Sequence, residues 1–119
     1  MQYVVLLSLF AVLGCAATPK PADREQINRE MPLVVDYENK RNAVKQAIYV
    51  LAAKGIIDQE TGRQVKESMD IEHVYYEASL ISLARGEMAE YRAYVGLAEQ
   101  ELNRTKSAIT NRVKALDPH

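Results

Sequence analysis

The chain has little of several residue types on which common kinds of protein depend. Its 119 residues include one cysteine, no tryptophan, five glycines and four prolines, and its net charge is −1. A single cysteine excludes an internal disulfide framework and a zinc site built from cysteines. Nucleic-acid-binding proteins normally carry a concentrated basic face, which this balanced composition does not suggest. The sequence therefore predicts no nucleic-acid partner.

Motifs of catalysis are also missing from the sequence. No phosphate-binding glycine loop, nucleophile elbow or zinc motif occurs along the chain. We therefore expect a protein that is not an enzyme, with no cofactor and no small-molecule substrate.

Residues 1–14 form an apolar segment without a charged side chain. The run from Tyr3 to Leu13 would rise roughly 16 Å as a helix, about half the thickness of a bilayer core. It is too short to span a membrane and matches the hydrophobic region of a secretory signal peptide. The positive residue that usually follows the start of such a signal is missing. We expect residues 1–14 to be a removable signal.

This segment ends in Val12-Leu13-Gly14-Cys15. The ending resembles the lipobox of bacterial lipoproteins, although Leu13 is bulkier than the residue usually found there. The resemblance implies cleavage between Gly14 and Cys15, a diacylglycerol on the Cys15 thiol and an acyl chain such as palmitate on the new amine. Ala16, where no aspartate stands, implies sorting to the outer membrane, facing the periplasm. The alternative is an uncleaved signal anchor or a buried first helix.

Residues 15–22 follow as the lipidated cysteine and a tether. Two closely spaced prolines, Pro19 and Pro21, favour an extended conformation. This segment is expected to hold the folded part away from the lipid surface.

Residues 23–119 have helical periodicity throughout and form the expected helical domain. Asp23 can cap a first helix with Gln26 three residues on, and Pro32 should kink or restart it. Lys54 and Gly55 mark its end. Apolar residues at helical spacing define one face of it: Ile27, Met31, Val34, Val44, Ile48 and Leu51.

Asp58 begins a second helix with Glu60 in its first turn. This helix has two apolar stripes, so it should pack against two neighbours. The first stripe comprises Val65, Met69, Tyr76, Leu80 and Leu83, and the second Ile71, Val74, Ala78 and Ile81. A third segment follows a nearly strict heptad through Met88, Tyr91, Val95, Ala98, Leu102, Ile109 and Leu116.

Gly86 separates the second and third segments. One glycine costs only about 1 kcal/mol inside a helix, but acidic starts and basic ends on each segment favour a break there. The predicted fold is therefore all-α: a signal helix, a tether and an antiparallel three-helix bundle. The alternative is a long helical hairpin whose second arm oligomerises as a coiled coil.

Asp70, His73 and Glu77 are the candidates for metal binding. Their spacing places them on one face of the second helix. A di-metal helical bundle needs carboxylates from several helices, usually with two Glu-x-x-His pairs, which this chain does not have. We interpret the three residues as a solvated polar stripe.

Tyrosine supplies all aromatic packing after the signal, since the one phenylalanine is Phe10. Tyr76 and Tyr91 fall on the apolar stripes and are candidates for the core. Tyr75 and Tyr94 fall off the main registers, which makes them candidates for a partner-binding surface.

These features predict a membrane-anchored envelope lipoprotein that acts as a non-catalytic helical binding or scaffolding module. Small helical lipoproteins of this general kind include secretin pilots, assembly accessory factors and phage-encoded envelope proteins such as outer spanins or exclusion factors. The partner would be an envelope protein or a second copy of the chain. One alternative is a metal-binding or enzymatic protein that uses Asp70, His73 and Glu77. Another is a self-assembling spacer that uses the heptad face from Met88 to Leu116.

Overall fold

Residues 24–116 are described by a computed structural model, and they form three α-helices without a strand between them. The helices are α2 (Arg24–Ala53), α3 (Gln59–Ala84) and α4 (Met88–Leu116). The predicted signal, Cys15, the tether and the cap at Asp23 lie outside the described residues.

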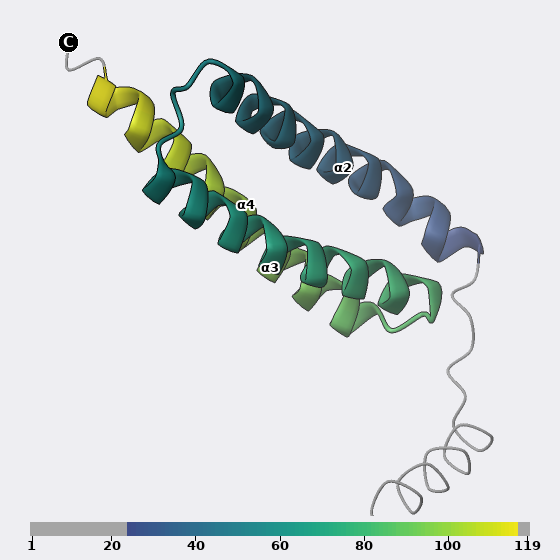
Figure 1. Cartoon of the computed structure of the whole chain (residues 1–119). Coiled ribbons are helices and arrows are strands. Elements are labelled where there is room, and N and C mark those ends of the chain that lie inside the picture. The colour runs from purple at the N-terminus through teal and green to yellow at the C-terminus, as the bar shows by residue number, and fades with distance from the viewer. Residues whose placement is uncertain (1–23, 117–119) are drawn as a thin grey trace, which may run out of the picture.

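The three helices run side by side in alternating directions, as Figure 1 shows. The short connections at 54–58 and 85–87 lie at opposite ends of the molecule, so α2 and α4 point the same way. This confirms the antiparallel three-helix bundle over the long hairpin. None of the helices within residues 24–116 has the length and hydropathy needed to cross a membrane.

Gly55 ends α2 in the way the sequence predicts. Its φ is +73°, a conformation that costs glycine little because it has no Cβ. Its N–H donates to the Ala52 carbonyl at 3.0 Å, and the Ile56 N–H donates to the Leu51 carbonyl at 2.9 Å. This pair of bonds is the Schellman closure, which satisfies carbonyls that the helix leaves open.

Gly86 ends α3 by the same device, again at a φ of +73°. The Gly86 N–H donates to Leu83 at 3.0 Å, and the Glu87 N–H donates to Ser82 at 2.9 Å. The helix therefore ends at Gly86, and α3 and α4 are two separate helices, as the charge pattern predicts.

Asp58 caps the start of α3. Its carboxylate accepts the Thr61 N–H at 3.0 Å. This hydrogen bond lowers the pKa of Asp58, with a smaller contribution from the positive charge of Arg112. The predicted helix start at Asp58, with Glu60 in the first turn, is confirmed.

Pro32 does not restart the first helix, because α2 continues through it from Arg24 to Ala53. A proline removes the hydrogen bond to the carbonyl four residues earlier, here that of Asn28. Both Pro32 and Asn28 are exposed. Water can therefore solvate the released carbonyl, which makes the interruption tolerable.

Small side chains join α3 to α4. Ser79, Ala98 and Thr105 are almost completely buried, and the two helices approach each other closely along their length. Short side chains allow backbones to come near, so α3 and α4 form the compact hairpin of the bundle.

Helix α2 rests on this hairpin through longer side chains. It makes few close backbone approaches to α3 or α4, and Figure 1 shows it standing apart from them. Tyr37, Arg41 and Val44 are its buried residues. Two of these three side chains are long and polar, so they span a wider gap than an aliphatic residue would.

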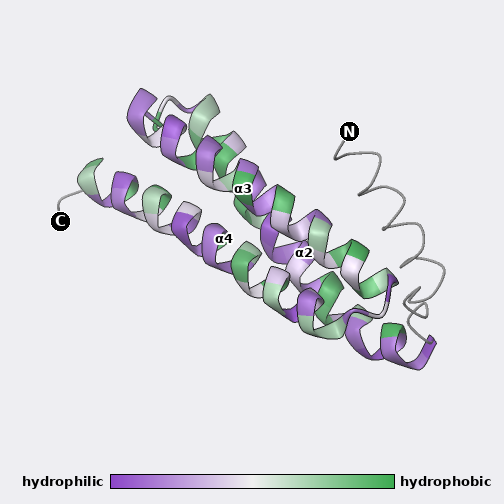
Figure 2. Ribbon diagram, turned by 90° about the horizontal axis from the view of Figure 1, so that it is seen from below, coloured by the Kyte–Doolittle hydropathy of each residue, from purple (hydrophilic) through white to green (hydrophobic). Residues whose placement is uncertain are grey.

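Some of the predicted apolar stripes are buried and others are not. Figure 2 shows apolar and polar residues alternating along every helix. Tyr76 and Tyr91 are buried as predicted. On the heptad face of α4, Ala98 and Leu102 are also buried, whereas Leu116 at its end is 52% exposed. The remaining members of that face are half-buried: Met88, Val95 and Ile109.

The second stripe of α3 does not find a neighbour, contrary to the prediction. Ile71, Val74 and Ile81 are exposed. The reason is that α2 and α4 both pack against the broad face centred on Glu72 and Ser79. Only one side of α3 is covered.

Leu102 is 1% exposed at the centre of the α4 stripe. We expect Leu102→Ala to lower the free energy of unfolding by about 2–5 kcal/mol, because it removes buried methyl groups and leaves a cavity. Urea denaturation measures this loss. Leu116→Ala on the same helix is the control, since Leu116 is 52% exposed. Equal losses in the two variants would contradict the burial of Leu102.

Candidate functional site

A buried ion pair connects α2 to α3 near the middle of both helices. The Glu72 side chain is 0% exposed and that of Arg41 is 5% exposed. Arg41 Nε donates to Glu72 Oε2 and Arg41 Nη2 donates to Glu72 Oε1, each at 2.8 Å. This two-pronged geometry is the strongest arrangement for an arginine and a carboxylate.

Tyr37 completes the coordination of the Glu72 carboxylate. Its hydroxyl donates to Oε2 at 2.7 Å. Burial raises the pKa of the Tyr37 phenol, and the neighbouring Glu72 raises it further. The hydrogen bond to Glu72 likewise raises the pKa of Arg41. Tyr37 therefore remains a neutral donor, and Arg41 a cation, over the physiological range.

Two tyrosine rings enclose this ion pair. The Arg41 guanidinium lies 4.2 Å from the centre of the Tyr76 ring, a cation–π contact. The Tyr37 and Tyr76 rings are 5.5 Å apart, and the Tyr76 hydroxyl donates to Glu38. No buried side-chain nitrogen or oxygen within residues 24–116 lacks a hydrogen-bond partner. The cluster is thus fully satisfied, and its hydrogen bonds hold α2 against α3.

The sequence contains the signal for this cluster, but apolarity alone does not reveal it. Tyr37 and Arg41 continue the three- and four-residue spacing between Val34 and Val44. Glu72 likewise continues the spacing from Val65 through Ser68 to Tyr76. A prediction that counts only apolar residues leaves out these polar positions. The feature that could have revealed the cluster is an arginine on one helix and a glutamate on another, each at a position with core spacing.

The metal candidates do not converge. The side chains of Asp70, His73 and Glu77 are more than half exposed, and Asp70 pairs with Lys66 at 2.7 Å. His73 Nε2 lies 3.6 Å from Glu77. Within residues 24–116, no group of three histidine, cysteine, aspartate or glutamate side chains could hold a metal ion.

Tyr75 of α3 and Tyr94 of α4 are brought together. Their rings stack with centres 6.4 Å apart, and both residues are half-buried. Tyr75 also packs against the edge of the core. The two residues therefore form a shared aromatic surface instead of two independent exposed side chains.

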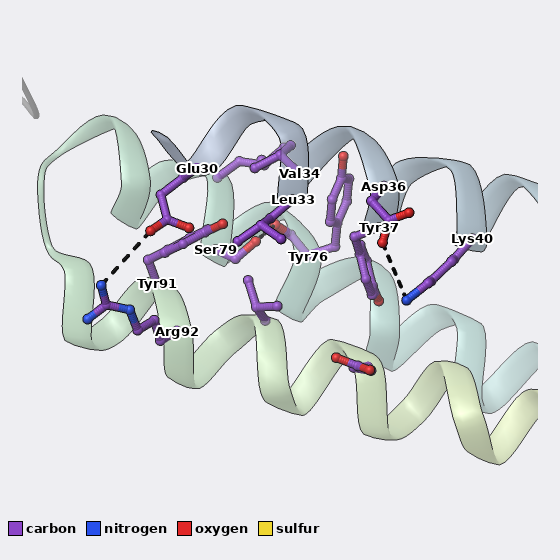
Figure 3. Close-up of a pocket in the computed structure, with 13 residues that line it drawn as sticks. Glu30, Leu33, Val34, Asp36, Tyr37, Lys40, Tyr76, Ser79, Tyr91 and Arg92 are labelled. Carbon is purple, nitrogen blue, oxygen red and sulfur yellow. Dashed lines mark hydrogen bonds and ion pairs between the residues drawn. The ribbon is translucent and has the colours of Figure 1, made fainter. Parts of the chain in front are cut away.

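A groove of about 390 Å³ lies on one side of the ion pair, between α2 and the hairpin (Figure 3). Tyr37 and Tyr76 stand at one end of it, and Tyr91 stands at the other. Aliphatic side chains form much of its wall: Leu33, Val34, Leu80 and Val95. Charged side chains of both signs lie at its rim: Glu30, Asp36, Lys40, Arg92 and Glu99. We call this the α2–α4 groove.

A second groove, of about 570 Å³, lies on the other side of the ion pair between α2 and α3. Its lining includes Ile48, Tyr49, Ile57 and Met69. Tyr49 is 78% exposed, so it borders this groove without closing it. Grooves on both sides of the ion pair are the direct result of the wide spacing of α2.

Polar contacts at both ends complete the attachment of α2. Arg112 Nε donates to the Ile56 carbonyl at 2.8 Å, beside the connection that follows α2. Near the other end, Arg92 lies 3.9 Å from Glu30. Burial raises the pKa of Tyr91, and the negative charge of Glu30 adds to this shift.

Comparisons with protein-family models, with curated proteins and with solved structures give no match to this chain.

We expect Glu72→Gln to lower the free energy of unfolding by about 3–5 kcal/mol, because Arg41 then becomes a buried charge without a counter-ion. Chemical denaturation measures the loss. The exposed pair of Asp70 with Lys66 is the control, and Asp70→Asn should cost at most about 1 kcal/mol.

A double variant separates the charge from the packing. Arg41→Met added to Glu72→Gln removes the uncompensated cation, so it should recover part of the lost stability. If the loss of stability in the double variant equals the sum of the losses in Glu72→Gln and Arg41→Met alone, the ion pair does not act as a unit.

Proposed function

We propose that this chain is a lipid-anchored protein of the bacterial envelope whose helical bundle binds another envelope protein. The Val12-Leu13-Gly14-Cys15 ending supports the anchor, because an apolar segment of signal length stops at the one cysteine of the chain. A diacylglycerol and an acyl chain together hold a protein stably at a membrane, since each buried methylene contributes about 0.8 kcal/mol.

The α2–α4 groove is the observation that carries the binding part of the proposal. It has an aliphatic wall, three tyrosines and a charged rim. Leu33 stands at its edge with 62% of its surface exposed. An exposed leucine beside an apolar hollow can gain contact area only by meeting another molecule.

The proposed occupant of this groove is an amphipathic helix of the partner. α2 and α4 run in the same direction along the two sides of the groove, so a helix of the partner can lie between them. Its apolar residues would contact Leu33 and Val95. The rim offers both signs of charge, with Glu30 near Arg92 and Asp36 near Lys40.

The location follows from the anchor. Ala16 after the cysteine favours the outer membrane, with the bundle on the periplasmic side. The seven residues 16–22 after the cysteine would let the bundle reach roughly 20 Å from the lipid surface if they are extended at about 3.1 Å per residue. The module would thus present its groove to periplasmic segments of envelope proteins.

The anchor is tested by mass spectrometry of the full-length gene product purified from bacterial membranes. We expect loss of residues 1–14 and the added mass of a diacylglycerol and an acyl chain. Cys15→Ser should abolish both changes and leave the signal uncleaved. An unmodified, full-length mass for the unaltered protein would overturn the lipoprotein assignment.

The groove is tested by placing a photo-crosslinking residue at position 33 in bacterial cells. We expect one discrete adduct whose second component is an envelope protein. Position 39 is the matched control, because Asn39 is exposed on α2 and does not line the groove. Equal adducts from both positions, none from position 33, or an adduct of two copies of the chain would each contradict the proposal.

A further inference from the structure

One face of α3 carries an apolar stripe that the bundle leaves uncovered. The stripe follows alternating four- and three-residue steps, the spacing of a coiled-coil seam. We call it the outer α3 stripe, and its members are Glu67, Ile71, Val74, Ala78, Ile81 and Arg85.

The apolar members of this stripe are unusually accessible. Val74 is 64% exposed, Ile81 49% and Ile71 37%. All three are β-branched residues that would normally be found in a core. With the half-buried Ala78 between Val74 and Ile81, they lie on consecutive turns of one helix, so they form a continuous surface instead of scattered exposed side chains.

Two copies of the stripe placed antiparallel bring complementary residues opposite each other. If a second α3 lies antiparallel along this stripe, with the two-fold axis midway between Val74 and Ala78, Ile71 meets Ile81 of the other copy. Val74 then meets Ala78, which places a larger side chain against a small one. Both pairings occur twice, as the two-fold symmetry of a homodimer requires.

The two charged ends of the stripe fit the same arrangement. Glu67, which lies 3.1 Å from Arg63 of its own chain and keeps its second oxygen free of that contact, meets Arg85 of the other copy, and the reverse pair forms at the opposite end. A parallel arrangement would instead place like charges together, which is unfavourable. Arg85 is exposed and makes no ion pair with any residue between 24 and 116 of its own chain.

Helix α4 extends this surface on one side. Tyr94 stacks on Tyr75, and Leu97, one turn further along the same face of α4, is 38% exposed. A shallow hollow of about 330 Å³ beside Ile71 continues between α3 and α4. A facing α3 therefore meets a broad surface with a polar edge at Glu101 and Arg104.

From these observations we infer that two copies of this chain associate through their outer α3 stripes, antiparallel about a two-fold axis midway between Val74 and Ala78. The charged ends set the direction, and the apolar centre supplies the contact. None of the stripe residues lines the α2–α4 groove, and Glu72, which bonds Arg41 of α2, lies on another face of α3, so the dimer leaves that groove open. The inference does not depend on the lipid anchor or on the proposed partner.

Directed disulfide formation in the full chain tests the arrangement. Two differently tagged copies are co-expressed, one with Ile71→Cys and the other with Ile81→Cys. Antiparallel pairing predicts a disulfide between the two tags, because only that arrangement brings the two positions within disulfide reach. The unaltered chain reports any background from Cys15. Disulfides only between identical tags, or none above background, would overturn the inference.

Charge exchange tests the ends of the stripe. In detergent-solubilised full chain, Glu67→Arg or Arg85→Glu alone should raise the dimer dissociation constant roughly tenfold, because two attractive pairs become repulsive. The double variant Glu67→Arg with Arg85→Glu should restore it. Glu77→Arg is the matched control, since it reverses an equal charge on α3 outside the stripe.

Sedimentation equilibrium measures the dissociation constants of these charge variants. The same measurement on Val74→Asp tests the apolar centre of the stripe. We expect Val74→Asp to abolish the dimer while circular dichroism still reports a folded helical chain. A double charge variant no tighter than the single variants would refute the proposed direction. A dimer unaffected by Val74→Asp, or an unaltered chain that stays monomeric, would refute the interface itself.

Discussion

The bundle depends on the ion pair between Arg41 and Glu72. Helix α2 has few close backbone approaches to the rest of the molecule, so long side chains must bridge the distance. Arg41 and Tyr37 do so, and Glu72 accepts hydrogen bonds from both. A buried carboxylate and guanidinium leave water at a large cost, which is recovered only when their geometry is correct. The pair therefore fixes where α2 lies along the hairpin.

The wide spacing that the ion pair requires also creates the surface of the protein. Serine, alanine and threonine let α3 and α4 approach closely, and tyrosine and arginine hold α2 further away. Hollows consequently remain on both sides of the ion pair, between α2 and the hairpin. A bundle whose three interfaces were all lined by leucine would be denser and would have no comparable grooves.

The two faces of α3 illustrate how one helix can serve two purposes. The face with Glu72 and Ser79 is buried and holds the bundle together. The opposite face keeps Ile71, Val74 and Ile81 exposed between an acidic and a basic end. A stability requirement explains the first face only. The second is better explained by association, because exposed β-branched residues at regular spacing stabilise nothing within the single chain.

The sequence by itself determined the local features of this protein. Helix ends at Gly55, Asp58 and Gly86 depend on neighbouring residues in the chain, so their positions could be predicted, as could the buried face of α4. The tertiary structure alone decided that Arg41 and Glu72 are core residues and that the second stripe of α3 has no neighbour. The reason is physical: a charged residue is stable in a core only if a counter-ion lies beside it, and the counter-ion of Arg41 comes from another helix. Residue spacing on one helix does not show where that partner will lie.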